Sequence, residues 1–193
     1  MTRRRHLFVV SLFIATLFTQ GCAVVAVGTA GAVAAKSAND RRTVGTQIDD
    51  TTASTQIAYR WGQVEGLSEL TNLQVNVYNG VALLTGQAPS QPLINQAESI
   101  AKSVEHITKV HNQIRIGQPI SASTQANDIW LGSKVKTQLL TEKDVPSLQI
   151  NVVVEDSEVF LMGRLTNAEA TKAVEITRNV NGVKRVVRAL ELM

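Results

Sequence analysis

The sequence predicts an α+β protein that contains two tandem copies of one small domain, each with two helices on one face of a three-stranded mixed sheet. Two observations support this. Patterns recur, since Val159-Phe-Leu-Met-Gly163 matches Ala82-Leu-Leu-Thr-Gly86 and Leu148-Gln-Ile-Asn-Val152 matches Leu73-Gln-Val-Asn-Val77. Spacing is also kept, because the second glycine-to-valine interval, Gly163 to Val180, is 17 positions and the first, Gly86 to Val104, is 18. Each copy spans about 65 to 70 residues, which suffices for a small core.

A helix is expected at the start of each copy, at about residues 52–64 and 127–141. The pair Asp49-Asp50 stands just ahead of the first of these helices, and Asn127-Asp128 stands at the start of the second. Side chains of this kind accept hydrogen bonds from the free N–H groups of a first helical turn. We therefore expect both pairs to act as N-caps.

An antiparallel hairpin is expected next in each copy. Ile150, Val152 and Val154 alternate with other residues, as in a strand with one buried face. In the first copy Asn79-Gly80 is typical of a two-residue turn with positive φ. In the second copy residues 155–158, Glu-Asp-Ser-Glu, are expected to form a solvated turn, because they lack the ligand spacing of a calcium loop.

A second helix and a last strand complete each copy. Thr166-x-x-Glu169 has the form of a capping box and predicts a helix that Asn181-Gly182 ends. Ser90 and Pro92 begin the corresponding helix of the first copy. The last strands are expected at residues 110–116 and 186–192. Each should run parallel to the second strand of its copy, because strand-helix-strand crossovers are right-handed.

This unit resembles the BON domain. The resemblance rests on Gly163 at the close of the second strand and on Gly182-Val-Lys-Arg-Val186 before the third. The first copy keeps Gly86 but has His106-Ile-Thr-Lys-Val110, so its second motif is partial. With its leader, linker and Val44-Gly-Thr-Gln-Ile-Asp-Asp50, the chain is similar to dual-BON outer-membrane lipoproteins. That resemblance implies a non-enzymatic protein that faces the periplasm and supports outer-membrane integrity.

The N-terminus has the layout of a secretory signal. Arg3, Arg4 and Arg5 precede an apolar run, and Gly21-Cys22 follows it. Cys22 is the only cysteine, so it cannot form an internal disulfide, and its position predicts lipid attachment. The alternative is a retained transmembrane helix within the uncharged residues 7–35. Either way the chain is exported and tethered to a membrane.

The expected organisation therefore has five parts. They are a signal peptide (1–21), a lipidated N-terminus with a flexible tether (22–46), a first BON domain (47–117), a linker (118–124) and a second BON domain (125–193).

Composition and motifs argue against several classes of function. Without the three leader arginines, the 19 basic residues become 16 and equal the 16 acidic ones, so nucleic-acid binding loses its compositional support. Convergent catalytic groups and metal-ligand spacings are not evident, and His106 and His111 are expected to be solvated. We predict no enzymatic activity, cofactor, metal or small-molecule substrate.

The outer face of the second sheet is predicted to be an interface. Phe160, Met162 and Val187 make this face apolar, whereas Thr85 and His111 lie on the corresponding face of the first sheet. Exposed apolar patches usually mark contact surfaces. We expect the first domain to cover this face, and the alternative is an adaptor that docks an outer-membrane assembly protein there.

The leading helix of the second copy is predicted to present a tryptophan to its surroundings. With Leu131, Val135 and Leu139 as the inward stripe, 100° per residue puts Trp130 about 140° from the centre of the stripe. Lys134 then lies about 40° from Trp130. Packing of Trp130 against the first domain is the competing interpretation.

Charge also distinguishes the second copy. Residues 124–193 carry nine basic and nine acidic residues, against four and six in residues 47–117. Trp is enriched where an apolar body meets a headgroup layer, and cations favour anionic lipid. Trp130, Lys134 and Lys136 are therefore the predicted contacts with an anionic phospholipid membrane.

Overall fold

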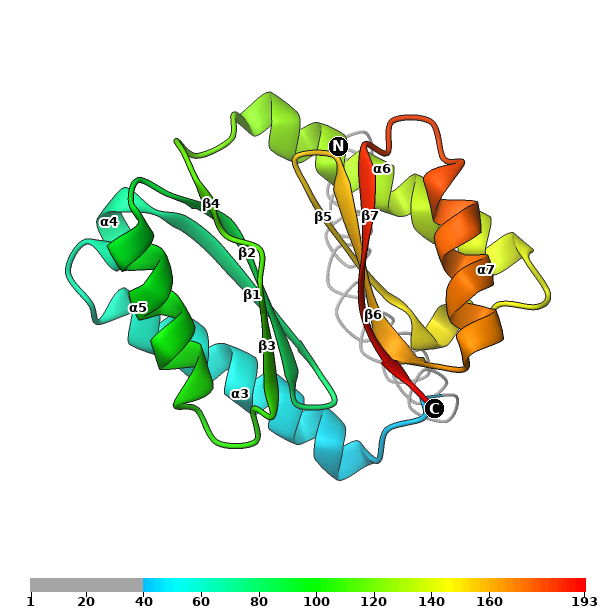
Figure 1. Ribbon diagram of the computed structural model, residues 1–193, viewed down its shortest axis with the longest axis horizontal. Coiled ribbons are helices and arrows are strands. Elements are labelled where there is room, and N and C mark those ends of the chain that lie inside the picture. The colour runs from blue at the N-terminus through cyan, green and yellow to red at the C-terminus, as the bar shows by residue number, and fades with distance from the viewer. Residues whose placement is uncertain (1–39) are drawn as a thin grey trace, which may run out of the picture. The chain divides into compact units, whose positions relative to one another are not determined.

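Two β-sheets lie face to face in the folded part of the chain, and helices cover their far sides (Figure 1). The computed structural model describes residues 40–193. Cys22, the predicted signal peptide and most of the predicted tether lie outside the described residues. The predicted α+β class is confirmed, with one mixed sheet in each copy.

The first domain contains helices α3 (Val44–Gly62), α4 (Leu67–Leu70) and α5 (Gln91–Lys102) and strands β1 (Asn72–Tyr78), β2 (Val81–Ala88), β3 (Lys109–Asn112) and β4 (Arg115–Ile116). Strand β1 is antiparallel to β2, whereas β3 and β4 are both parallel to β2. The predicted last strand is therefore split in two. At the break the side chain of Asn112 accepts a hydrogen bond from the N–H of Ile114 at 3.0 Å.

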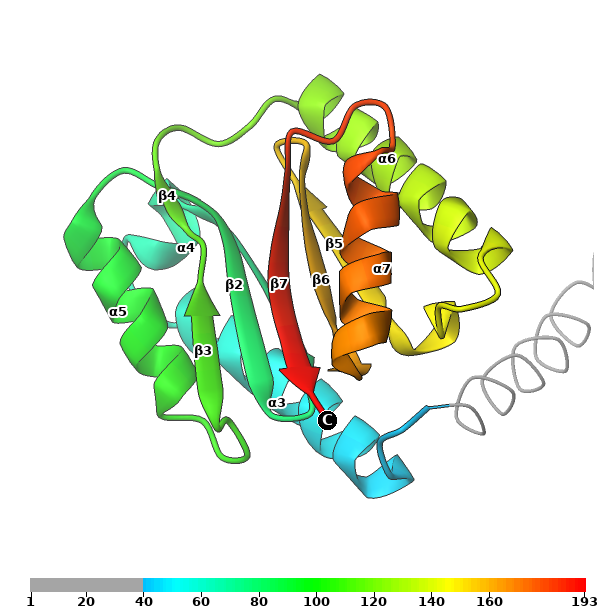
Figure 2. The same ribbon diagram turned by 45° about the vertical axis from the view of Figure 1, so that its right-hand side comes forward.

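The second domain contains helices α6 (Ala122–Thr141) and α7 (Asn167–Arg178), the short 3-10 helix η1 (Ser147–Gln149) and strands β5 (Asn151–Glu155), β6 (Glu158–Leu165) and β7 (Arg185–Leu192). The sheet order is β5-β6-β7, with β5 antiparallel and β7 parallel to β6, as predicted. Figure 2 shows α6 and α7 on the side of this sheet that faces away from the first domain.

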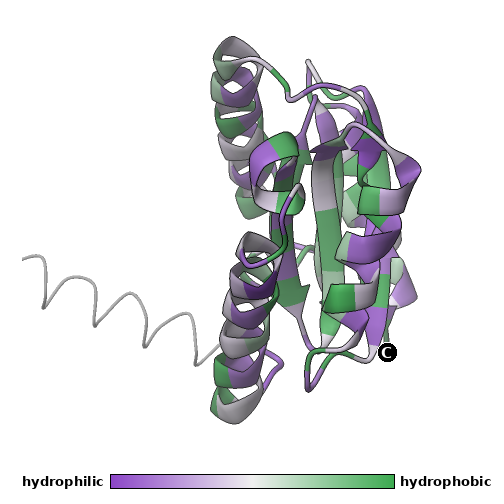
Figure 3. Cartoon of the chain, turned by 90° about the vertical axis from the view of Figure 1, so that its left-hand side faces the viewer, coloured by the Kyte–Doolittle hydropathy of each residue, from purple (hydrophilic) through white to green (hydrophobic). Residues whose placement is uncertain are grey.

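Each domain has its own hydrophobic core between sheet and helices. Ile57 and Trp61 of α3 are buried in the first core, and the indole N–H of Trp61 donates to the carbonyl of Ala97 at 3.0 Å. Val135 and Leu139 of α6 are buried in the second core. Figure 3 shows hydrophobic residues along the strands, whereas the helices carry both hydrophobic and hydrophilic residues.

The leading helices begin earlier than predicted. Thr43 and Ser121 are the N-caps, and their side chains accept hydrogen bonds from the N–H groups of Thr46 and Thr124. The predicted starts at residues 52 and 127 were wrong because apolar spacing marks only the turns that pack on a core. Residues 44–46, which we assigned to the tether, are helical.

The repeat register of the first strand also differs from the sequence match. A Cβ at Gly86 would lie 1.8 Å from the carbonyl oxygen of Asn72, and one at Gly163 would lie 2.5 Å from that of Gln149. These close approaches make Asn72 equivalent to Gln149, so Leu73 corresponds to Ile150 and not to Leu148. The error of two residues left the buried face unchanged, because side chains on a strand alternate with period two.

Asp50 and Asp128 are buried helical residues that bind the hairpin turns, so their predicted role as N-caps was wrong. The carboxylate of Asp50 accepts from the N–H groups of Asn79 at 2.7 Å and Gly80 at 2.8 Å. The carboxylate of Asp128 accepts from the N–H groups of residues 156 and 157 at the same two distances. Each leading helix is thereby fastened to the turn of its own hairpin.

The turn of the second hairpin is not solvated, contrary to our prediction. Glu155 and Ser157 are 4% and 8% exposed. Asp156 forms ion pairs with Arg115 and Lys184, both at 3.1 Å. Local sequence patterns did not predict this burial, because it arises where the turn meets the other domain.

Candidate functional site

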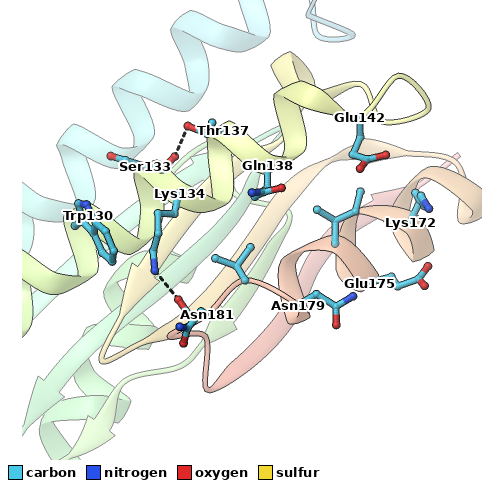
Figure 4. Close-up of a pocket in the computed structure, with 12 residues that line it drawn as sticks. Trp130, Ser133, Lys134, Thr137, Gln138, Glu142, Lys172, Glu175, Asn179 and Asn181 are labelled. Carbon is cyan, nitrogen blue, oxygen red and sulfur yellow. Dashed lines mark hydrogen bonds between the residues drawn. The ribbon is translucent and has the colours of Figure 1, made fainter.

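Trp130 lies on the outer surface of α6, and 61% of it is exposed. The ammonium group of Lys134 lies 3.9 Å from the centroid of the indole ring, a cation-π contact. The same group donates a hydrogen bond to the carbonyl oxygen of Asn181 at 2.5 Å, as Figure 4 shows. The indole therefore has a fixed neighbour on its own helix while much of its surface stays accessible.

The loop after α7 is shaped to accept this lysine. Gly182 has φ +104°, in the left-handed region that favours glycine. A Cβ at Gly182 would lie 3.5 Å from the side chain of Leu131 and 3.8 Å from the Lys134 ammonium. A side chain there would strain the turn that presents the Asn181 carbonyl. This explains why the Gly182-Val motif has glycine at this position.

A groove of about 720 Å³ runs between α6 and α7 beside Trp130 (Figure 4). Hydroxyl and amide groups of Ser133, Thr137 and Asn179 line it together with Ile176 and Val180. Sequence reasoning missed this groove, because only the packing of α7 beside α6 brings its two walls together. Trp130 and Lys134, two of the predicted contacts, belong to the wall contributed by α6.

Lys136 does not belong to the same cluster. It lines a second groove, of about 470 Å³, formed by α6 with the edge strand β5 and with Gln74 and Asn76 of the first domain. Ile129, which is 74% exposed, lies on this side of the helix. The structure thus brings Trp130 and Lys134 together and leaves Lys136 on a neighbouring surface.

Phe160 and Met162 are 1% and 0% exposed. They lie in a cluster with Tyr78 and Leu83 of the first domain, and Val187 packs against the same cluster while partly exposed. The outer faces of the two sheets therefore meet there. Among the described residues, the apolar face that we predicted to be an interface is covered by the first domain.

Polar contacts surround this apolar cluster. The side-chain amide of Gln87 donates to the carboxylate of Glu155 at 2.6 Å, and both residues are buried. Burial raises the pKa of Glu155, and the negative charge of Asp128 adds to this while the hydrogen bond from Gln87 opposes it. Arg115 of β4 pairs with Glu158 at 2.5 Å, at the edge of the same interface.

Within residues 40–193 no group of three or more His, Cys, Asp or Glu side chains could hold a metal ion. His106 is exposed, whereas His111 is half-buried rather than solvated. Burial lowers the pKa of His111, and the charge of Lys109 lowers it further. None of the helices in this part of the chain has both the length and the apolar character needed to span a bilayer.

Both copies of the repeated unit match one known domain family. The BON domain family model matches residues 49–118 and 127–193, which together make up most of the chain. This chain therefore belongs to the BON-domain family and contains two copies of the domain, as the sequence predicted.

The chain is also similar to individual known proteins along most of its length. The chain is 35% identical to the outer membrane lipoprotein DolP of Haemophilus influenzae over 179 residues, which cover 93% of this chain and 92% of that protein. It is 36% identical to the 21 kDa hemolysin of Actinobacillus pleuropneumoniae over 78% of each chain. It is 28% identical to the osmotically-inducible protein Y of Escherichia coli over 77% of this chain and 75% of that one. The predicted resemblance to dual-BON outer-membrane lipoproteins is confirmed.

Proposed function

We propose that this protein is a non-enzymatic outer-membrane lipoprotein, anchored through Cys22 and facing the periplasm, whose second domain binds anionic phospholipid. The observation that carries the lipid-binding proposal is the exposed indole of Trp130 with the ammonium of Lys134 beside it. Indoles favour the boundary between hydrocarbon and headgroups, and a neighbouring cation favours anionic headgroups. The similarity to an outer membrane lipoprotein supports the anchor and the location.

The contact is expected to be weak by itself. A cation near an anionic surface contributes about 1 kcal/mol, and one indole adds a modest apolar area. A lipid anchor on Cys22 would keep α6 close to the membrane, so that a weak contact is populated without high intrinsic affinity. The proposed role in outer-membrane integrity rests on the resemblance to dual-BON outer-membrane lipoproteins and not on these contacts.

The structure gives less support to the adaptor hypothesis. An adaptor that used the apolar sheet face would need Phe160 and Met162 to be accessible, but both are buried against the first domain. Binding of an outer-membrane assembly protein at another surface stays a prediction.

Vesicle co-sedimentation of a fragment that begins at Ser37 tests the lipid-binding proposal. Trp130→Glu and Lys134→Glu should each reduce binding to phosphatidylglycerol vesicles, with little binding of any form to phosphatidylcholine. Tyr59→Glu is the matched control, because Tyr59 is 67% exposed on α3, the equivalent helix of the first domain. Thermal melts confirm folding. Folded Trp130→Glu protein that sediments like the parent would exclude α6 as the contact.

A further inference from the structure

Arg41 and Arg42 precede the first helix, and their side chains bind different domains. The guanidinium of Arg41 makes two hydrogen bonds with the carboxylate of Glu169 on α7, at 2.8 and 2.9 Å. It donates a third to the carbonyl oxygen of Arg164, at the end of β6, at 2.8 Å. Arg41 is therefore attached to the second domain by three charge-assisted bonds.

Arg42 is attached to the first domain. Its guanidinium pairs with the buried carboxylate of Asp50 at 2.6 Å and lies 3.8 Å from the centroid of the Tyr78 ring. Tyr78 is itself part of the apolar cluster between the two sheets. Two adjacent residues thus connect the point where the chain enters the folded body to both sides of the domain interface.

The acceptors on both sides are held in place before either arginine binds. Glu169 is the last residue of the Thr166 capping box, in which its carboxylate accepts from the N–H of Thr166 at 2.8 Å. Asp50 is fixed by the two N–H groups of the first hairpin turn. Bidentate pairing to a fixed carboxylate costs less side-chain entropy than an exposed pair of mobile side chains.

We propose that Arg41 and Arg42 form a latch that keeps the two domains face to face and couples the membrane tether to that closure. The second copy offers a comparison, because Ile120 and Pro119 occupy the corresponding positions before the Ser121 N-cap. The paired arginines are therefore specific to the place where the tether joins. The coupling to a tether rests on the function proposed above.

The latch also determines where the tether enters relative to Trp130. Glu169 lies in the first turn of α7, whereas Lys134 contacts Asn181, beyond the last turn of the same helix. Twelve helical residues span about 18 Å, so the two points are separated by roughly that distance. Arg41 follows Cys22 by 19 positions, a stretch of chain that reaches at most about 65 Å. Both the anchor and Trp130 can therefore reach one membrane while the latch is closed.

Methionine oxidation tests the latch in the full-length protein in detergent. Met162 is fully buried in the interface, whereas Met193 is 54% exposed and serves as an internal reference. Hydrogen peroxide treatment followed by mass spectrometry gives the two oxidation rates separately. Arg41→Gln and Glu169→Gln should each speed Met162 oxidation by about tenfold and leave Met193 unchanged. Glutamine also serves at this capping-box position, so Glu169→Gln removes the pairing with Arg41 and not the helix cap.

Two further variants complete the test. The double variant Arg41→Gln with Glu169→Gln should oxidise Met162 no faster than Arg41→Gln alone, because both changes remove the same pairing, and Lys172→Gln on the same helix should leave the rate unchanged. Equal Met162 oxidation in the parent and both single variants, or a double variant whose effect is the product of the two single effects, would overturn the latch. This measurement needs no lipid, so it tests the latch alone. Whether Trp130→Glu loses vesicle binding tests only the proposed function.

Discussion

The hairpin turns of the two domains are held by the same kind of hydrogen-bonded contact but differ in the residues that surround it. In both, a buried aspartate of the leading helix binds two consecutive N–H groups of the turn. In the first domain Arg42 pairs with that aspartate. In the second domain Ile120 occupies the position of Arg42, and the turn itself carries the charges.

This difference follows from what each turn contacts. Asn79, in the first turn, donates to Glu191 of the second domain at 2.5 Å, beside the latch. Asp156, in the second turn, binds Arg115 of the first domain, and its neighbour Glu155 binds Gln87. The duplicated unit thus keeps its backbone contacts, and its two copies diverge where they contact each other.

The largest expected effect comes from the apolar centre of the interface. Phe160 and Leu83 occupy equivalent positions in the two copies and lie in one cluster. Phe160→Ala should lower the free energy of unfolding by about 3–5 kcal/mol and Leu83→Ala by about 2–5 kcal/mol. The double variant should lose less than the sum, because the two changes share one cavity. Urea denaturation measures all three, and strict additivity would contradict a shared cluster.

The aspartates should rank next. Asp128→Ala leaves two N–H groups of the turn without an acceptor, and we expect a loss of about 2–4 kcal/mol in the free energy of unfolding. Asp50→Ala should cost more, because it also removes the partner of Arg42. Urea denaturation of both variants, with Asp49→Ala at the neighbouring, partly exposed position as control, compares the losses. A smaller effect at Asp50 than at Asp128 would contradict the role given to Arg42.

Acid should affect two interdomain contacts in opposite directions. The pairing with Arg41 lowers the pKa of Glu169 from 4.5 to about 2, so its contribution is complete above pH 4.5 and is lost as the pH falls toward 2. Burial raises the pKa of Glu155, so its contribution is complete below pH 4.5 and is lost as the pH rises through the raised value. Melting temperatures from pH 2 to 8 should show the first effect disappear in Glu169→Gln and the second in Glu155→Gln. Identical pH profiles for the parent and either variant would contradict the corresponding assignment.

The smallest expected effect concerns backbone conformation at the turns. Ser157 has φ +62° where the first copy has Gly80 at φ +73°. Ser157→Gly should raise the free energy of unfolding by about 0.5–1 kcal/mol, because glycine adopts this region without a Cβ penalty. Gly80→Ser should lower it by more, since a Cβ there would lie 2.7 Å from the carbonyl oxygen of His106. Thermal melts suffice, and a destabilised Ser157→Gly would show that its side chain has a role of its own.

Local patterns predicted most of the fold. The alternation in β5, the capping box at Thr166 and the inward stripe of α6 each depend on neighbours in the sequence, so the elements and the position of Trp130 could be derived. The functions of Asp50, Glu155 and Arg41 depend on partners 29 to 128 positions away. Their sequence context suits a helix cap, a polar turn and a tether equally well. Only the folded chain shows which groups meet them.

The packing of one sheet on the other has a consequence for folding. A lone copy of the second domain would expose the face around Phe160 and Met162 and would need another molecule to cover it, as in a symmetric dimer. The extent of folding would then vary with protein concentration. In the whole protein the first domain covers this face, and the linker joins the two domains in one chain. Closure of this interface is therefore a unimolecular step. A melting temperature independent of concentration is the expected signature.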